Sequence, residues 1–131
     1  SMLVHKDKYD VIFVVSLFSH LALPFWTAWF KQLYNMLSNG GLLVISTHGD
    51  YCFDQLDANS KARSKKIEEG FLYLEISETK RLPLNEYGTT YVDRNFVENF
   101  ALQNHPEATI SFYPRGLWNF QDVYVIEKPR S

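Results

Sequence analysis

Two stretches decide the fold: YDVIFVVS at residues 9–16 and LSNGGLLVIS at residues 37–46. Residues 9–16 run through β-branched and aromatic side chains without alternating with polar ones. That pattern is typical of a strand buried on both faces, as in a parallel sheet. Residues 42–46 repeat it directly after a Gly-Gly pair, and they predict a second buried strand.

The residues between these strands predict a loop and one helix. Residues 17–23 read as the loop, and Pro24 suits the first turn of the helix that follows. The apolar residues of this helix recur at helical spacing and should form one buried face. They are Trp26, Trp29, Phe30, Leu33, Met36 and Leu37. Residues 38–41 are expected to end the helix, because Gly supplies a left-handed cap. Strand, helix and strand then form a right-handed unit with parallel strands.

The middle of the chain predicts shorter elements. These are a loop at residues 47–50, a charged helix at 59–70, a strand or extended piece at 71–76, a loop at 82–85 and a helix after Asp93. Asn59 or Ser60 would cap the first of these helices and Gly70 would follow its end, whereas Asp93 would cap the second. The second helix has one apolar face, made of Phe96, Val97, Phe100 and Ala101.

The chain ends in a predicted hairpin. Residues 109–113 and 122–127 read as strands, and the seven residues 114–120 join them. A connection this short implies antiparallel pairing. The sequence shows no repeat or internal boundary, so residues 1–131 are expected to form a single domain.

Composition excludes several classes of protein. The 13 basic and 15 acidic residues give a net charge of −2, so we expect no nucleic-acid partner. The single Cys52 rules out an internal disulfide and a four-cysteine zinc site, and it suits a cytoplasmic protein. Residues 11–30 carry no charge over a membrane-spanning length, but Pro24 and polar residues interrupt them, so no membrane span is expected.

The order of these elements resembles the C-terminal half of a class I S-adenosylmethionine-dependent methyltransferase. Four segments carry the resemblance: YDVIF with SLFSHL (9–13 and 16–21) for the fourth strand and its loop, LSNGGLLV (37–44) for the turn into the fifth strand, YGTTY (87–91) for the insertion region, and QDVYV (121–125) for the closing hairpin. They span nearly the whole chain. The implied fold is α/β, a partial Rossmann-like methyltransferase sheet. It corresponds to the last four strands, in the order 4-5-7-6 with an antiparallel final hairpin, flanked by helices.

The resemblance leaves out the half of the fold that binds most of the cofactor. Glycine occurs only at positions 40, 41, 49, 70, 88 and 116, so there is no clustered glycine-rich loop. The resemblance therefore implies a fragment or truncated form of an S-adenosylmethionine-dependent methyltransferase. Its methyl acceptor would be an unknown small molecule or glycan. We expect the chain to be inactive alone and to bind S-adenosylmethionine weakly or not at all.

Candidate site residues follow the ends of the predicted parallel strands, where α/β sheets bind ligands. The resemblance implies that Ser16, Leu17 and Phe18 line the methionine end of the cofactor. His20 would stand near the substrate, where a histidine can act as a general base. The residues expected on the substrate side are Thr47, His48, Tyr51, Arg115 and Trp118.

Plainer interpretations of these residues remain open. His20 could bond only to loop backbone, the hairpin residues could only pack a long loop, and the basic run at residues 61–66 could be a solvated helix face. His48, Asp50 and Cys52 could ligate a metal, but no HExxH or CxxC pair supports them, so no metal is expected. A nucleophile pair of Cys52 and His48 would require the two side chains to meet in space.

Residues 10–16 correspond to a strand that pairs, in the resembled family, with a strand this chain lacks. They should therefore form a sheet edge with unpaired backbone groups. An uncovered apolar sheet face marks an association surface. We expect a homo-oligomer, such as a twofold dimer, joined through residues 10–16 or through the uncovered face. The alternative function is a non-catalytic oligomerisation module that completes its sheet with a second chain. A complete small α/β protein with its own ligand is a third option.

Overall fold

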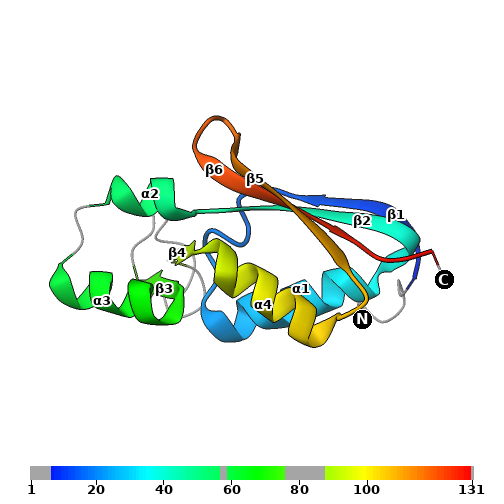
Figure 1. The fold of residues 1–131 in the computed structure, drawn as a ribbon, viewed down its shortest axis with the longest axis horizontal. Coiled ribbons are helices and arrows are strands. Elements are labelled where there is room, and N and C mark those ends of the chain that lie inside the picture. The colour runs from blue at the N-terminus through cyan, green and yellow to red at the C-terminus, as the bar shows by residue number, and fades with distance from the viewer. Residues whose placement is uncertain (1–6, 57–58, 76–87, 131) are drawn as a thin grey trace.

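The structure is a computed structural model, and it describes residues 7–56, 59–75 and 88–130. Its helices and strands are β1 (Tyr9–Val14), α1 (Leu23–Asn35), β2 (Leu37–Thr47), α2 (Asp50–Asp54), α3 (Ser60–Glu69), β3 (Phe71–Leu74), β4 (Thr89–Val92), α4 (Arg94–Asn104), β5 (Thr109–Leu117) and β6 (Gln121–Glu127) (Figure 1). Within the described ranges, no helix combines the length and apolarity needed to cross a membrane.

The main sheet has four strands in the order β1-β2-β6-β5. β1 runs parallel to β2, with Phe13 opposite Val44. β2 and β6 are antiparallel, with Val44 opposite Val125. β5 and β6 form the antiparallel hairpin at the end of the chain. This arrangement confirms the predicted α/β class and the strand order 4-5-7-6.

Helix α1 carries the predicted buried face. Pro24 lies in its first turn, and Trp26, Phe30 and Leu33 are buried against the sheet and α4. Trp29 does not belong to this face, since it is 37% exposed. The reason is angular: at about 100° per residue, Trp29 lies about 60° from Trp26 on the side away from Phe30, at the margin of the buried face.

The predicted end of α1 is wrong. The helix stops at Asn35, Met36 caps it in a right-handed conformation, and Leu37 already opens β2. Residues 38–41 therefore belong to the strand and do not cap the helix. Gly40 does adopt a φ of 79°, but it does so inside β2, where the register between β1 and β2 shifts.

Helices α1 and α4 cover one face of the sheet (Figure 1). The strand residues beneath them are fully buried: Leu43, Ile45, Tyr124 and Ile126. Asp93 caps α4 as predicted, because its side chain accepts the N–H of Phe96 at 2.8 Å. The core of the molecule thus lies between these two helices and the sheet.

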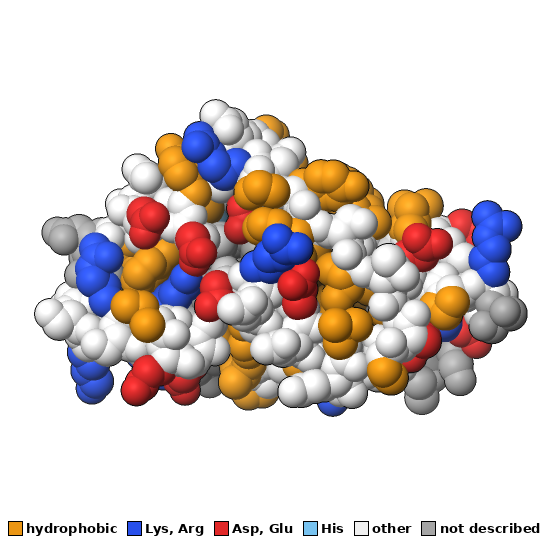
Figure 2. All heavy atoms as spheres, viewed as in Figure 1, with side chains coloured by type: hydrophobic (Ala, Val, Ile, Leu, Met, Phe, Trp, Pro, Cys, Tyr) orange, Lys and Arg blue, Asp and Glu red, His pale blue; other side chains and the backbone are white. Residues whose placement is uncertain are grey.

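The opposite face of the sheet, here called the outer face, consists of Val11, Phe13, Leu42, Val44, Val123 and Val125. Paired strand residues point to the same side, so Phe13, Val44 and Val125 form one row across it. Figure 1 shows no described helix over this face, and Figure 2 shows hydrophobic side chains along the corresponding upper margin. Val11 is 58% and Phe13 63% exposed. β1 does form the expected sheet edge, but the prediction of a strand buried on both faces is wrong.

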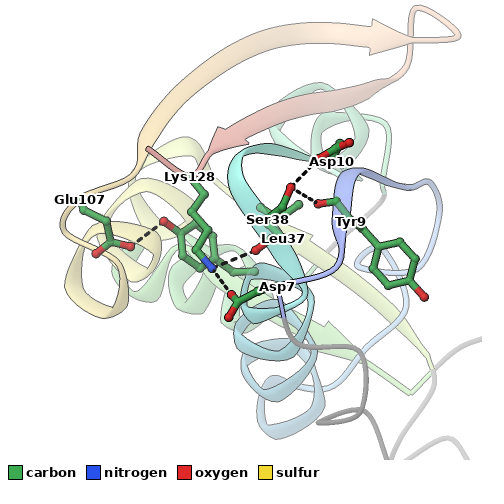
Figure 3. A network of polar contacts seen from close by, with 8 residues as sticks. Asp7, Tyr9, Asp10, Leu37, Ser38, Glu107 and Lys128 are labelled. Atoms are coloured by element: carbon green, nitrogen blue, oxygen red, sulfur yellow. Dashed lines mark hydrogen bonds and ion pairs between the residues drawn. The ribbon is translucent and has the colours of Figure 1, made fainter. Parts of the chain in front are cut away.

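Polar contacts fix the end of the sheet where β1 and β2 begin (Figure 3). Lys128 Nζ donates to Asp7 Oδ1 and to the carbonyl of Leu37, both at 2.9 Å. The Ser38 hydroxyl donates to Asp10 Oδ1 at 2.5 Å. The amino ends of both parallel strands are therefore held together, and their carboxyl ends meet at the far edge of the sheet.

The segment between β2 and α4 contains two elements that the sequence did not predict. Helix α2 occupies part of the expected loop after β2. β4 pairs with β3 in a separate two-stranded sheet. Residues 82–85, expected as a loop, and the last residue of the strand expected at 71–76 lie outside the described residues.

Helix α3 confirms its predicted caps. Asn59 accepts a backbone N–H through its side chain at 2.9 Å, and Gly70 follows the helix with a φ of 69°. Lys66, expected on a solvated face, is instead buried. It forms an ion pair with Asp50 and lies over the ring of Phe53, so one member of the basic run packs against α2.

The terminal hairpin is tighter than predicted. Leu117 pairs with Gln121, so residues 118–120 make the connection instead of residues 114–120. Trp118 and Asn119 each have a φ of 55°, which closes this short turn.

Candidate functional site

Polar side chains gather where β1 and β2 end. The loop of residues 15–22 follows β1, and Thr47 closes β2. β6 begins at the same edge, since Thr47 pairs with Asp122. β4 reaches this edge through a parallel bridge between Tyr91 and His48. We call this group of segments the carboxyl-edge site.

Ser16 adopts a strained backbone conformation in the turn at the start of this site. It is a non-glycine residue with a φ of 59°, a conformation that costs about 1–3 kcal/mol and often occurs at functional sites. Its N–H donates to the Ser46 hydroxyl at 2.9 Å. Its own hydroxyl accepts from Gln121 Nε2 at 3.3 Å. Side chains from β2 and β6 thus fix the first residue expected to bind the cofactor.

The next two residues expected to bind the cofactor support the loop from the core. Phe18 is fully buried, with its ring edge-on to Trp26 at 5.1 Å. Leu17 is partly buried and also packs against the core. Their contact with a cofactor stays a prediction.

The structure brings together two histidines from separate loops. The rings of His20 and His48 lie edge-on, with 5.9 Å between their centroids. His20 Nδ1 donates to the carbonyl of Gly88 at 2.8 Å. His48 also contacts the rings of Tyr91, at 5.4 Å, and Phe120, at 6.2 Å. His48 is therefore packed among aromatic side chains from β4 and from the hairpin turn.

β4 holds both histidine loops in place through its backbone. The N–H groups of Gly88, directly before β4, and of Thr90 each donate to the loop after β1 at 2.8 Å, and the N–H of Val92 donates to the carbonyl of His48 at 2.9 Å. Figure 1 shows the loop after β1 passing beside β4. Sequence reasoning missed this strand, although TTYV at residues 89–92 is rich in residues that favour strands.

The surroundings of His48 favour its neutral form. Burial, and to a smaller extent the neighbouring His20, lowers its pKa to about 4, whereas the Thr90 backbone opposes the shift. Its Nδ1 is buried without a hydrogen-bond partner among the described residues. Other buried atoms in the same condition at this edge are Ser19 Oγ, Thr47 Oγ1 and Gln121 Oε1. Such atoms need a ligand or water to satisfy them.

The hairpin forms one wall of the site. The guanidinium of Arg115 lies 3.7 Å from the centre of the Tyr51 ring. Tyr51 in turn meets Phe120 edge-on at 6.0 Å. Phe120 also contacts His48. Tyr51 and Arg115, both expected on the substrate side, are therefore linked through Phe120 to the histidine pair. Trp118 lies at the hairpin tip and is 72% exposed, so its substrate contact stays a prediction.

Asp122 anchors the inner side of the site, and sequence reasoning did not single it out. Its carboxylate accepts the N–H of Arg115 at 2.9 Å, and burial raises its pKa. Gly49 packs directly against it, since a Cβ at residue 49 would stand 1.8 Å from Oδ2. Ser46, Tyr91 and Gln121 were missed in the same way, because only the strand pairing places them here.

Cys52 has no catalytic arrangement. Its thiol donates to the carbonyl of Phe120 at 3.2 Å, and burial raises its pKa to about 11, so it stays protonated. The proposed nucleophile pair with His48 is therefore not supported. Within the described parts of the chain, no three His, Cys, Asp or Glu side chains are placed to hold a metal ion.

Comparison with known proteins finds relatives by sequence and by fold. No protein-family profile matches the chain. The chain is 27% identical, over 128 aligned positions, to a tRNA U34 carboxymethyltransferase of Sulfurovum sp. (strain NBC37-1). The alignment spans 84% of this chain and 42% of that protein.

Solved structures share the fold. A S-adenosylmethionine-dependent methyltransferase from Methanosarcina mazei superposes with a TM-score of 0.60 at 12% identity, over 97% of this chain and 62% of that one. A "possible exported protein" from Bordetella parapertussis superposes with a TM-score of 0.53 at 14% identity, over 95% of this chain and 40% of that one. The chain thus spans about two fifths to three fifths of the length of the proteins it matches.

These findings show that the chain shares the S-adenosylmethionine-dependent methyltransferase fold over part of the length of its relatives. The strand order and the antiparallel final hairpin agree with those expected from the resemblance.

Proposed function

We propose that this chain is part of a S-adenosylmethionine-dependent methyltransferase, forms the acceptor-facing wall of its active site, and transfers no methyl group alone. The observation that carries the proposal is a mismatch between the sequence pattern of β1 and its exposure in the structure. Its sequence is that of a strand covered on both faces, yet Val11 is 58% and Phe13 63% exposed. A further part of the same sheet, with its own helices, would cover this edge and the outer face.

The residues present fit only the methionine end of the cofactor. Gln121 Oε1 is a buried acceptor without a described partner, and it lies beside the strained Ser16 turn. This pair would hold an ammonium group, which only donates hydrogen bonds. The scattered glycines offer no loop to cradle the nucleotide end. When bound, the cofactor supplies an electrophilic methyl group on sulfur. On this chain, His20, His48 and Tyr51 would then face the acceptor.

The acceptor is a small molecule or a glycan. The Sulfurovum relative is named for a tRNA, but this chain has 13 basic and 15 acidic residues, a balance that does not favour phosphate contacts. The unpaired, buried Cys52 supports a cytoplasmic setting.

Calorimetric titration with S-adenosylhomocysteine tests the proposal. We expect the 131-residue chain to show no binding tighter than about 1 mM. A chain extended by the reading frame upstream of Leu3 should bind in the micromolar range and methylate an acceptor. Micromolar binding by the 131-residue chain, or an extended chain that does not bind, would contradict the proposal.

A second candidate function is self-association through the outer face. The row formed by Phe13, Val44 and Val125 is apolar and continuous with the outer edge of β1, along which no other described strand lies. A second copy placed edge to edge would pair the backbone of β1, whereas one placed face to face would cover this row.

Light scattering tests the second candidate. We expect a dimer at micromolar concentration, and we expect Phe13→Lys to convert it to a monomer, because a buried lysine at the interface lacks a partner. The matched control is Ile67→Lys, at an apolar residue of α3 that is 79% exposed and away from the outer face. A monodisperse monomer for the unmodified chain, or equal dissociation by both variants, would refute self-association.

A further inference from the structure

A groove lies where the end of α3 meets the start of α4, and the proposed function does not use it. The N–H of Asp93 donates to the carbonyl of Gly70 at 2.9 Å, which holds these two helix ends together (Figure 1). The groove consists of two adjoining cavities, of about 470 and 320 Å³, and Glu69 and Phe96 line both of them. None of the candidate site residues named above lines either cavity, so we treat the α3–α4 groove as a separate feature of the surface.

The larger cavity of the α3–α4 groove is apolar. Its uncharged lining residues are three aromatic and two aliphatic ones from β3, α4 and the start of α1: Phe71, Tyr73, Phe96, Ala22 and Leu23. Its two charged lining residues, Lys65 and Glu69, form an ion pair with each other at 3.9 Å. Because this pair compensates its own charge, the cavity is suited to an apolar group.

The smaller cavity is acidic. Glu68, Glu69 and Asp93 line it, and no basic side chain of the described residues does. Glu69 pairs with Lys65, and Asp93 caps α4, but Glu68 has no basic partner within the described ranges. Charge complementarity therefore favours a cationic group in this cavity and disfavours phosphates and carboxylates.

A row of three side-chain amides runs along α4 beside the acidic cavity. Asn95, Asn99 and Gln103 follow one another at four-residue intervals, all three are exposed, and all three line the cavity. Each amide offers both a hydrogen-bond donor and an acceptor, as a peptide group does. Successive amides are about 6 Å apart along the helix axis, since each residue rises by about 1.5 Å. An extended peptide repeats its backbone groups on one side every two residues, or about every 7 Å, so its spacing matches the row.

We propose that the α3–α4 groove docks an extended peptide segment of another protein, with one apolar side chain followed by basic ones. The apolar side chain enters the larger cavity, and the basic side chains face Glu68 and Asp93. The peptide backbone bonds to the amides of α4. A small polyamine would satisfy the carboxylates, but it has no apolar group for the larger cavity and no carbonyl for the amides. This docking is additional to methyl transfer and does not depend on it.

Titration of the ¹⁵N-labelled chain with acetyl-Phe-Thr-Lys-Thr-Lys-amide tests the proposal. In an extended peptide its Phe and both Lys side chains point to the same side. We expect the side-chain NH₂ signals of Asn95, Asn99 and Gln103 to shift to saturation at millimolar peptide. Replacing the peptide's Phe by Ala should weaken binding at least about tenfold. Replacing both Lys by Glu should abolish it, and spermidine should leave the NH₂ signals in place. No shift with the first peptide, or equal shifts with spermidine or the acidic peptide, would overturn the proposal.

Variants of α4 test the role of the amide row. Asn99→Ala should weaken peptide binding about fivefold, as expected for the loss of one hydrogen bond. Asn99→Gln keeps the amide and should restore most of the affinity. The matched control is Asn104→Ala, on the same helix, because that side chain donates to the Phe100 carbonyl at 2.9 Å and does not line the groove. Equal weakening by Asn99→Ala and Asn104→Ala, or no rescue by Asn99→Gln, would overturn the proposed backbone contact.

Discussion

Trp26→Ala is expected to lower the free energy of unfolding by about 3–5 kcal/mol, the range for truncating a fully buried aromatic residue. Trp26 has no exposed surface. Its ring stacks on Phe30 at 5.6 Å and meets Phe18 and Phe96 edge-on at 5.1 and 5.4 Å. Trp26 therefore lies where α1, the loop after β1 and α4 meet. Its removal leaves a cavity that these three elements cannot fill by moving inward. Urea unfolding followed by circular dichroism measures the loss.

Trp29→Ala is the matched control for this prediction. It removes the same side chain from the same helix, but Trp29 is 37% exposed. We expect a loss below about 1 kcal/mol, as for most partly exposed positions. Similar losses for the two variants would show that Trp26 is not the centre of the core.

Gly49→Ala is expected to cost about 1–3 kcal/mol, the usual cost of forcing extra volume into a packed site. An added Cβ would stand 1.8 Å from Asp122 Oδ2 and 2.6 Å from its Cγ. The carboxylate would have to move away and release the N–H of Arg115, which it now accepts at 2.9 Å. Thermal unfolding measures the cost, and faster hydrogen exchange at the Arg115 amide reports the release.

Two comparisons make this prediction specific. Gly116→Ala should cost less than Gly49→Ala, because a Cβ there would stand 3.1 Å from its nearest contacts, Tyr113 Cβ and the Tyr113 carbonyl oxygen. In an Asp122→Ala background, Gly49→Ala should become nearly neutral, since the clashing atoms are gone. An equal cost in both backgrounds would place the strain elsewhere.

Local signals predicted most of the fold correctly. Asn59, Gly70 and Asp93 mark helix ends through contacts within a few residues, so the sequence carries the full information. The strand order followed from the arrangement of elements and from the family resemblance. By contrast, α1 was extended too far, because Met36 and Leu37 satisfy helical spacing while also suiting the start of a buried strand.

Burial of β1 could not be predicted from its own residues. An uninterrupted apolar run indicates that both faces of a strand can be buried. Whether Val11 and Phe13 are buried depends on what actually lies beside them. The pattern and the structure therefore describe two different surroundings for the same strand.

The candidate site was predicted only in part. The rule that ligands bind at strand ends correctly gathered Ser16, His20, Thr47 and His48 at one edge. It could not find Gln121, which reaches Ser16 through long-range pairing of β6 with β2. The local sequence of β4 favours a strand, but its role at the site could not be predicted, since that role arises from bonds to loops distant in sequence.

The pairing of β2 with β6 has a consequence for how the molecule assembles. β1, α1 and β2 are neighbours in sequence, and so are β5 and β6, so each group can close over short loops. Only the β2–β6 pairing joins these two groups within the main sheet, and it spans the longest separation in the sheet. Its loop-closure entropy makes it a late step in folding and an early step in partial opening. The bond from Gln121 to Ser16 crosses this junction, so the site exists only in molecules that have completed the last stage of folding.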